Sequence, residues 1–353
     1  MVRWIAVLFA LAIAFRAHPE TRYPEVAPGR VFRFPADHGA HPDYRTEWWY
    51  VTGWLQVDGR PLGFQVTFFR SRIQGQDENP SRFAPKQILI AHAALSDPAH
   101  GRLLHDQRVS RAGFGLAEFA VGEAKVTLDG WRFEQQGDGF WTVIVGRGLA
   151  LDLKLEPTQP LLLQGQGGYS RKGPKEGSAS YYYTLPHLRV SGTVTRDNQP
   201  RAVTGEAWLD REWSSQYLES GAEGWDWTGI NLDDGAVLMA FRMRRKGGGT
   251  VWAGGTLRSA TGEVTVLQPE DVAFEPRRVW RSPRSGASYP VAVTVRAGDR
   301  SIELEPMMDD QENDTRRSTG AIYWEGAVRA KEGGREVGRG YLELTGYWSA
   351  MRL

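Results

Sequence analysis

Residues Glu47–Gly53 read Glu-Trp-Trp-Tyr-Val-Thr-Gly, and residues Glu223–Gly229 read Glu-Gly-Trp-Asp-Trp-Thr-Gly. Each stretch runs on to an Asp-Gly pair, and at a constant offset of 176 residues 6 of 13 positions are identical. Apolar runs on either side of an Asp-Gly pair are typical of a β-hairpin. Two segments of the chain therefore begin with similar hairpins, which predicts an internal duplication.

The ends of the two halves also resemble each other. Gly205 is followed eight residues later by Trp213, and Gly340 is followed eight residues later by Trp348. Because the halves agree at both ends, we predict two tandem, homologous domains at residues 30–215 and 222–353.

The composition predicts an all-β protein. The 353 residues include 41 Gly and 19 Pro, which are spread between short apolar runs as in turn-rich β proteins. No segment carries an apolar stripe of helical period long enough for a major helix. We expect each domain to be an antiparallel β-barrel of the lipocalin (calycin) kind, which can hold one small apolar ligand. Residues Gln164–Ser180, rich in Gly and Lys, predict a mobile loop over a site or a poorly ordered one.

The first 18 residues are typical of a secretory signal peptide. Arg3 precedes an apolar run, Ile5–Phe15, and small residues favour cleavage after Ala17. The run is shorter than the roughly 20 residues of a transmembrane helix. We therefore expect a periplasmic or secreted protein that contacts a membrane only if the signal segment stays attached.

The charge balance and the lack of cysteine exclude several classes of function. Lys and Arg total 43 and Asp and Glu total 42, so there is no electrostatic reason to expect nucleic acid or an anionic membrane as a partner. Without Cys, the chain has no disulfide, no thiolate nucleophile and no Cys-based zinc or iron–sulfur site. The sequence predicts no metal site and no cofactor.

Three carboxylates lack a counterpart in the other half and are our candidate acids and bases. Asp210 and Glu212 lie two residues apart, which places both on one face of a strand. Asp226 stands where the first half has Tyr50. Neighbouring carboxylates in a dry site acquire different pKa values and can serve as acid and base. The alternative is an ion-pair corner at the domain junction, formed with Arg45, Arg70 or Arg242.

Two histidine sites are further candidates. His38 and His41 follow Asp37 in a segment that could form a proton relay or hold a metal, and a hydrogen-bonded plug that closes the barrel is the structural alternative. His92 shares a strand face with apolar residues, which suits either a pocket histidine or a buried core histidine.

Several long motifs resemble the AttH family, which is similar to the bacterial carotenoid 1,2-hydratases (hydroxyneurosporene synthases). The resemblance rests on residues 34–53, 205–215, 224–227, 310–312, 323–326 and 341–347. It implies a two-domain lipocalin-like fold, export, and a role often described as that of a secreted hydrolase. Some members are encoded beside ABC-transporter components. More distant relatives on this fold catalyse cycloadditions, so the fold does not define the reaction.

The chain departs from the hydratases at two points. They carry an Asp-His-x-Trp element where this chain has Asp210–Trp213, with Arg211 in place of the His. They also use an alkene-protonating acid on a strand that corresponds to residues 237–244 here, which contain no carboxylate. If the chain hydrates an alkene, the acid must therefore come from elsewhere.

We consider three functions. The first is an enzyme that hydrates or hydrolyses a hydrophobic lipid or isoprenoid, with Asp210, Glu212 and Asp226 as acid and base and His38 or His92 assisting. The second is a non-catalytic periplasmic carrier of such a ligand that works with an ABC transporter, and the third is a carbohydrate-active protein. A closed apolar pocket with Asp210 and Glu212 pointing into it favours the enzyme, whereas carboxylates all paired to arginine favour the carrier. The candidate ligand-binding residues are Glu47, Trp48, Trp49, Arg70, His92, Trp208, Trp225 and Trp227.

Overall fold

The computed structural model describes residues 21–351, and they form two large antiparallel β-sheets with two short 3₁₀ helices. The predicted all-β fold is confirmed. The strands of the first sheet are β1 (Thr46–Val57), β2 (Arg60–Arg72), β3 (Gln87–Ser96), β4 (Leu104–Arg111), β5 (Ala117–Phe119), β6 (Lys125–Leu128), β7 (Trp131–Gln136), β8 (Gly139–Val145), β9 (Leu149–Glu156), β10 (Leu162–Leu163), β11 (Tyr169–Arg171), β12 (Ala179–Arg196) and β13 (Gln199–Gln216).

The second sheet follows after a short connection. Its strands are β14 (Ala222–Leu232), β15 (Val237–Arg245), β16 (Thr250–Arg258), β17 (Val264–Leu267), β18 (Val272–Arg281), β19 (Ser288–Ala297), β20 (Arg300–Pro306), β21 (Glu312–Asp314), β22 (Ile322–Glu332) and β23 (Arg335–Leu344). The 3₁₀ helices are η1 (Ala36–His38) and η2 (Pro269–Asp271).

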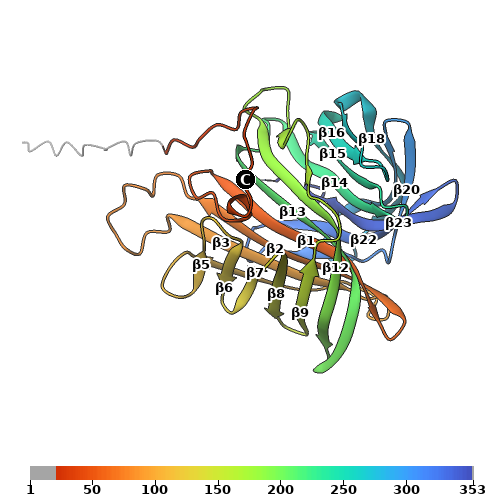
Figure 1. Cartoon of the computed structure of the whole chain (residues 1–353), viewed down its shortest axis with the longest axis horizontal. Helices are drawn as coiled ribbons and strands as arrows, with labels where there is room; N and C mark the ends of the chain where they lie inside the picture. The colour runs from red at the N-terminus through yellow and green to blue at the C-terminus, as the bar shows by residue number, and fades with distance from the viewer. Residues whose placement is uncertain (1–20, 352–353) are drawn as a thin grey trace, which may run out of the picture.

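Each sheet curls upon itself, and the two lie against each other (Figure 1). The first has the order β4-β3-β2-β1-β13-β12-β9-β8-β7-β6-β5, and β3 and β4 contact β6, so it forms a nearly closed barrel. The second has the order β17-β16-β15-β14-β23-β22-β20-β19-β18, and β15 and β16 contact β18. The chain thus adopts the expected two-barrel architecture. The hairpin from β1 to β2 turns at Asp58 and Gly59, which have φ of 49° and 77° as a type I′ turn requires.

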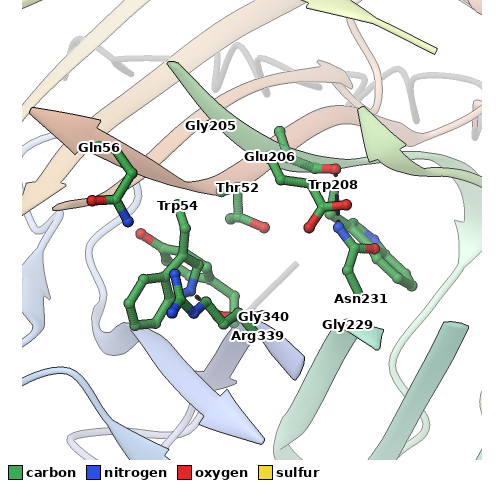
Figure 2. A pocket seen from close by; sticks show the side chains of 13 residues that line it. Thr52, Trp54, Gln56, Gly205, Glu206, Trp208, Gly229, Asn231, Arg339 and Gly340 are labelled. Atoms are coloured by element: carbon green, nitrogen blue, oxygen red, sulfur yellow. Dashed lines mark hydrogen bonds between the residues drawn. The ribbon is translucent and has the colours of Figure 1, made fainter. Parts of the chain in front are cut away.

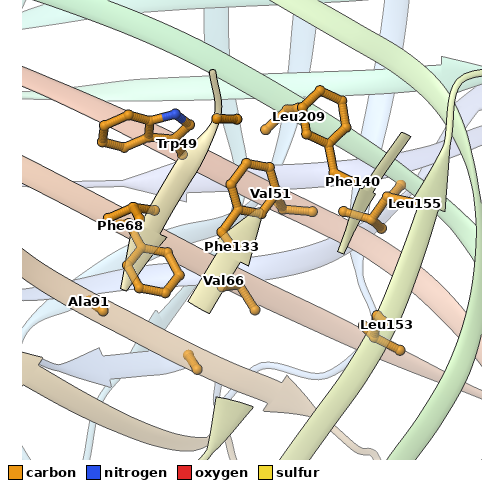
Figure 3. Close-up of a cluster of buried hydrophobic side chains, with 14 of the residues drawn as sticks. Trp49, Val51, Val66, Phe68, Ala91, Phe133, Phe140, Leu153, Leu155 and Leu209 are labelled. Atoms are coloured by element: carbon orange, nitrogen blue, oxygen red, sulfur yellow. The ribbon is translucent and has the colours of Figure 1, made fainter. Parts of the chain in front are cut away.

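Hydrophobic side chains fill the interior of the first barrel (Figure 3). Trp49 and Val51 of β1 point inward with Phe68 of β2, Phe133 of β7 and Leu153 of β9, and all five are buried. The second barrel has its own buried cluster. Side chains thus pack densely in both interiors, as in other protein cores.

A third hydrophobic cluster joins the outer faces of the two barrels. It contains Tyr50 of β1 and Trp208 of β13 from the first barrel, and Trp227 of β14 and Tyr341 of β23 from the second. The barrels approach closely at Gly63, where an added Cβ would lie 2.7 Å from the Cβ of Ala327. Four of the five candidate ligand-binding tryptophans therefore lie at this junction: Trp48, Trp208, Trp225 and Trp227.

The duplicated motifs begin β1 and β14, but their side chains face opposite ways. Trp49 points into the core of the first barrel. Trp225, at the same motif position, packs on the cluster between the barrels. Side chains alternate along a strand, so a shift of one residue reverses every facing. The two motifs are alike in sequence, but equivalent motif positions face the barrel interior in one half and the junction in the other.

A polar plug covers one end of the first barrel, as one interpretation of the His38 segment predicted. Glu47 is fully buried and forms ion pairs with both Arg70 and Arg211. Its carboxylate also accepts hydrogen bonds of 3.0 and 3.1 Å from the backbone N–H of His41. Burial alone would raise the pKa of Glu47, but the two guanidinium groups hold it well below its usual range. Glu47 is therefore ionised and structural.

The predicted signal peptide, residues 1–18, lies outside the described residues. Within residues 21–351, no helix has the length and apolar character needed to cross a membrane.

Replacing Glu47 with Gln should lower the free energy of unfolding by roughly 3–5 kcal/mol, because two buried guanidinium groups lose their counter-charge. The native pKa of Glu47 is depressed, so its stabilisation is present above the unfolded pKa and is lost as the pH falls below about 4. Glu47→Gln should consequently flatten the acid side of the stability profile. Urea unfolding at several pH values measures both effects, with Glu263→Gln, at an exposed turn, as the control. Equal stability of Glu47→Gln and wild type would contradict the proposed role of the ion pairs.

Candidate active site

A cavity lies between the outer faces of the two barrels. It offers about 70 Å³ to the centres of water molecules. The first barrel contributes Trp48, Tyr50, Phe69, Asp210 and Glu212. The second barrel contributes Trp225, Trp227, Tyr323, Glu325 and Glu343, and Tyr217 comes from the connection between the sheets. Four carboxyl groups thus share one largely aromatic enclosure.

Aromatic rings that meet edge to face form one wall of the cavity. The Trp48 and Tyr217 ring centroids are 5.0 Å apart, those of Tyr217 and Trp225 are 5.6 Å apart, and those of Tyr50 and Trp227 are 5.2 Å apart. Such contacts fix the ring positions and leave some faces toward the cavity. Faces of this kind bind apolar groups and attract cations.

Glu325 and Glu343 form a pair of buried acids. They lie directly opposite each other on β22 and β23, and both side chains line the cavity. Burial, together with the neighbouring Glu343, raises the pKa of Glu325 well above its ordinary value. Burial raises the pKa of Glu343 to about 7, although its hydrogen bond from the Trp225 indole (2.9 Å) opposes the shift. These surroundings therefore favour the neutral form of Glu325.

The two oxygens of Glu325 have different surroundings. Tyr50 donates a hydrogen bond of 2.6 Å to Oε1. Oε2 is buried and has no hydrogen-bond partner among the described residues. An unpaired buried polar atom is unfavourable unless a ligand or water completes it. Oε2 is therefore the oxygen that can still accept or donate a hydrogen bond within the cavity.

Asp210 is a carboxylate held by three donors. It accepts hydrogen bonds from the hydroxyls of Tyr182 and Thr184, each at 2.5 Å, and from the Trp208 indole at 2.7 Å. Burial raises its pKa to about 7, while these donors favour the ionised form. Asp210 can therefore take up or release a proton near neutral pH.

Glu212 is paired with a buried lysine. Lys172 Nζ lies 2.9 Å from its carboxylate, and Ser180 also donates to it. The same Nζ donates to the Ser170 hydroxyl at 3.1 Å and lies 4.1 Å from the centroid of the Phe241 ring. Burial raises the pKa of Glu212 and lowers that of Lys172. Lys172 comes from residues 164–180, the segment predicted to be a loop, of which β11 pairs with β12 and the rest up to Ser178 is mostly turns and bends.

A second hollow, of about 180 Å³, lies elsewhere along the same junction (Figure 2). Its carboxylate, Glu206, contacts the ring of His187. Asn231 is hydrogen-bonded to the backbone of His187 at 3.2 Å, and the Trp54 indole donates to a backbone carbonyl at 3.0 Å. These groups already satisfy one another, so this hollow lacks the unpaired acid of the aromatic cavity.

Five of the residues singled out in the sequence line the aromatic cavity: Asp210, Glu212, Trp48, Trp225 and Trp227. Trp208 supports them through its hydrogen bond to Asp210. Glu47, Arg70, Trp49 and His38 lie instead in the plug and the core of the first barrel. The arrangement separates them from the acids of the junction.

The side chain of Asp226 lies on the face of β14 that is turned toward the interior of the second barrel, away from the cavity. Arg242 Nε lies 2.6 Å and Arg244 Nε lies 3.0 Å from its carboxylate, and the Tyr347 hydroxyl donates to it at 3.0 Å. This is the arginine-locked arrangement that we expected of a structural carboxylate.

The two histidine candidates are both buried and hydrogen-bonded. His38 Nδ1 lies 2.6 Å from the Tyr183 hydroxyl, and burial lowers its pKa to about 4. His92 contacts the hydroxyls of Tyr323 and Ser318, each at 3.0 Å, and burial lowers its pKa to about 3. Both are neutral at neutral pH, and His92 orients Tyr323, which lines the cavity.

Sequence reasoning missed Glu325, Glu343, Tyr50 and Lys172 as members of the site. Tyr323, Glu325 and Ala327 alternate on one face of a strand, which was a detectable signal. Nothing in the sequence alone pairs Glu325 with Glu343, because that depends on the register of β22 and β23. Among the described residues, no group of three or more His, Asp or Glu side chains could hold a metal ion.

Comparison with known proteins shows the family to which this chain belongs. Residues 25–347 match the family described as AttH-like. A crystal structure from Nitrosomonas europaea, described as an AttH, has 52% sequence identity and a TM-score of 0.87, and the match covers 92% of this chain and 99% of that one. No curated protein matches the chain by sequence.

Two more distant structures share the fold. Kievitone hydratase from Nectria haematococca has 14% identity and a TM-score of 0.69, with 93% of this chain and 97% of that chain covered. CghA has 14% identity and a TM-score of 0.50, with 94% and 95% covered. The family match over nearly the whole described chain confirms the resemblance found in the motifs, and the protein belongs to the AttH-like family.

Proposed function

We propose that this protein binds a hydrophobic small molecule in the cavity between the barrels and adds water to one of its carbon–carbon double bonds. The observation that carries the proposal is Glu325, a buried acid with one unpaired oxygen inside an aromatic enclosure that favours its neutral form. An acid that protonates an alkene must keep its proton at neutral pH and act where water does not compete for it.

The first step is transfer of a proton from Glu325 to an alkene carbon. A C–H bond forms, the π bond breaks, and a carbocation and the Glu325 carboxylate result. The faces of Trp48, Trp225 and Trp227 lie around this position and stabilise positive charge. The developing Glu325 carboxylate accepts the hydrogen bond from Tyr50, which strengthens as the charge appears.

The second step is attack of water on the carbocation, with Asp210 as the base. The C–O bond forms while one water proton moves to the Asp210 carboxylate, which its three donors hold in place. Tyr50 lies directly opposite Asp210 in the β1–β13 ladder and also contacts Glu325. A proton returned from Asp210 to Glu325 restores the starting state, so the net reaction is alkene plus water to alcohol.

The partners of the carboxyl groups favour an enzyme over a carrier. In the cavity they contact hydroxyls, indoles and one lysine, whereas the arginine-paired carboxylates Glu47 and Asp226 lie elsewhere. One protein of this fold is named kievitone hydratase, so its name describes the addition of water. That name supports the proposal by analogy. We further propose, from the sequence alone, that the protein acts after export.

The first test concerns the protonation states. In protein labelled with ¹³C at glutamate carboxyl carbons, we expect three resonances to titrate above the ordinary glutamate range, those of Glu212, Glu325 and Glu343, with that of Glu343 near pH 7. Glu325→Gln should remove one of them and Glu343→Gln another. A wild-type protein in which every glutamate titrates near its ordinary value would rule out Glu325 as the acid.

The second test is the effect of Glu325 on stability. Its raised native pKa means that the folded state holds a proton that the unfolded state releases, so rising pH destabilises the fold between the unfolded and the native pKa. Relative to Glu325→Gln, wild type should lose up to about 1.4 kcal/mol per pH unit in that range. Chemical unfolding from about pH 5 to pH 8 measures the difference. Parallel pH profiles of the two proteins would contradict it.

The third test is the reaction itself. Wild-type protein incubated in H₂¹⁸O with isoprenoid alkenes should form alcohols that contain one ¹⁸O, as measured by mass spectrometry. Glu325→Gln and Asp210→Asn should each reduce the rate by at least about 100-fold, as expected for loss of a general acid or base. Glu263→Gln, at an exposed turn, is the matched control and should react like wild type. Full activity of Glu325→Gln would refute the mechanism.

A further inference from the structure

Two neighbouring surface segments of the first barrel, residues 79–86 and 107–117, form a stacked aromatic surface. The rings of Phe83 and Phe114 lie 5.4 Å apart and are parallel to within 4°. Arg111 Nη1 donates a hydrogen bond of 2.7 Å to the Phe83 carbonyl oxygen and so ties the segments together. We call Arg82, Phe83, Val109, Arg111, Phe114 and Leu116 the Phe83–Phe114 patch.

The patch concentrates exposed apolar side chains. Phe83 is 58% exposed, Phe114 47%, Val109 48% and Leu116 49%. Twelve large hydrophobic residues are exposed among those described, and four of them lie in these two short segments. Scattered exposed apolar residues need no explanation, but a local concentration of them marks an interaction surface.

The backbone at Phe114 is held in an unusual conformation. Its φ is +62°, a value that aromatic residues rarely adopt, and it stands between Gly113 and Gly115, whose φ values are also positive. Non-glycine residues in this region are strained, and such strain is found preferentially at functional sites. Here the tight turn places a large ring at the tip of the surface.

The two segments carry an excess of cations. They contain Arg82, Lys86, Arg108 and Arg111 and no Asp or Glu, and the exposed Glu78 and Glu118 border them in the chain. Arg108 pairs with Asp106 and Asp129, so the cationic character rests on the other three. The guanidinium carbons of Arg82 and Arg111 lie 5.7 and 4.6 Å from the Phe114 ring centroid. Cations and aromatic rings are therefore presented together.

We propose that the Phe83–Phe114 patch docks this protein onto the surface of a lipid bilayer that carries anionic headgroups. Aromatic rings settle in the interfacial zone of a bilayer, where one side is apolar and the other wet. Arginine binds headgroup phosphates through its planar fork of donors. The contact is peripheral and reversible, because a few side chains do not anchor a protein stably. The proposal stands on different residues from the proposed reaction, and bilayer docking would place the protein where hydrophobic molecules reside.

The test is co-sedimentation of the mature protein, without its predicted signal segment, with vesicles. We expect binding to vesicles of phosphatidylglycerol and phosphatidylcholine and much weaker binding to phosphatidylcholine alone, with added salt reducing the difference. Phe83→Ala/Phe114→Ala should weaken binding by about tenfold or more. Arg82→Gln/Arg111→Gln should weaken binding to the anionic vesicles by about fivefold per arginine and leave binding to phosphatidylcholine unchanged.

The matched control is Val264→Ala/Val279→Ala, which removes apolar surface of similar exposure from the second barrel and should bind like wild type. Circular dichroism melts establish that each variant is folded. The proposal is overturned if wild type does not sediment with anionic vesicles, or if a folded Phe83→Ala/Phe114→Ala protein binds as well as wild type. It is also overturned if the patch instead makes the protein self-associate without binding vesicles, as light scattering would show.

Discussion

The alternation of side chains along β1 and β13 is the constraint on which the rest of this structure depends. On β1, Trp49 and Val51 enter the core of the first barrel, while Trp48 and Tyr50 face the second barrel. On β13, Leu209 and Trp213 point inward, and Asp210 and Glu212 point outward. A shift of register by one residue would place Asp210 and Glu212 in the hydrophobic core. It would also move the core tryptophans Trp49 and Trp213 to the junction. The same hydrophobic pattern that closes the barrel therefore also delivers the acids to the cavity.

The sequence predicted the architecture well because hairpin turns and strand periods are local signals. It also identified Asp210 and Glu212, since period two is enough to place both on one face. The same reasoning could not separate Asp226 from them. Asp226 lies on the barrel side of β14, and only the three-dimensional structure reveals its pairing with Arg242 and Arg244. Glu325 and Glu343 were missed because their encounter depends on strands that pair in a register the sequence does not state.

The net charge of the whole chain did not reveal the local excess of cations near Phe83 and Phe114. A net charge of +1 gave no reason to expect an anionic membrane as a partner, yet Arg82, Lys86 and Arg111 gather in residues 79–86 and 107–117, bordered by the acids Glu78 and Glu118. Electrostatic attraction to a surface depends on the charges within about a Debye length of the contact, so the local balance matters and the total does not. The fold creates this local excess by bringing Phe83 and Phe114 into contact.

Glu47 and Glu325 are both buried glutamates, but their surroundings shift their pKa values in opposite directions. Both are buried, but Glu47 sits between two arginines, which keep it ionised and make it part of the fold. Glu325 receives one hydroxyl hydrogen bond and faces another acid, so its neutral form is favoured. A buried acid without a counter-charge destabilises a protein, and a hydrophobic residue in its place would pack at lower cost. The ion pairs of the plug account for an acid at Glu47, and the reaction that we propose for the cavity accounts for one at Glu325.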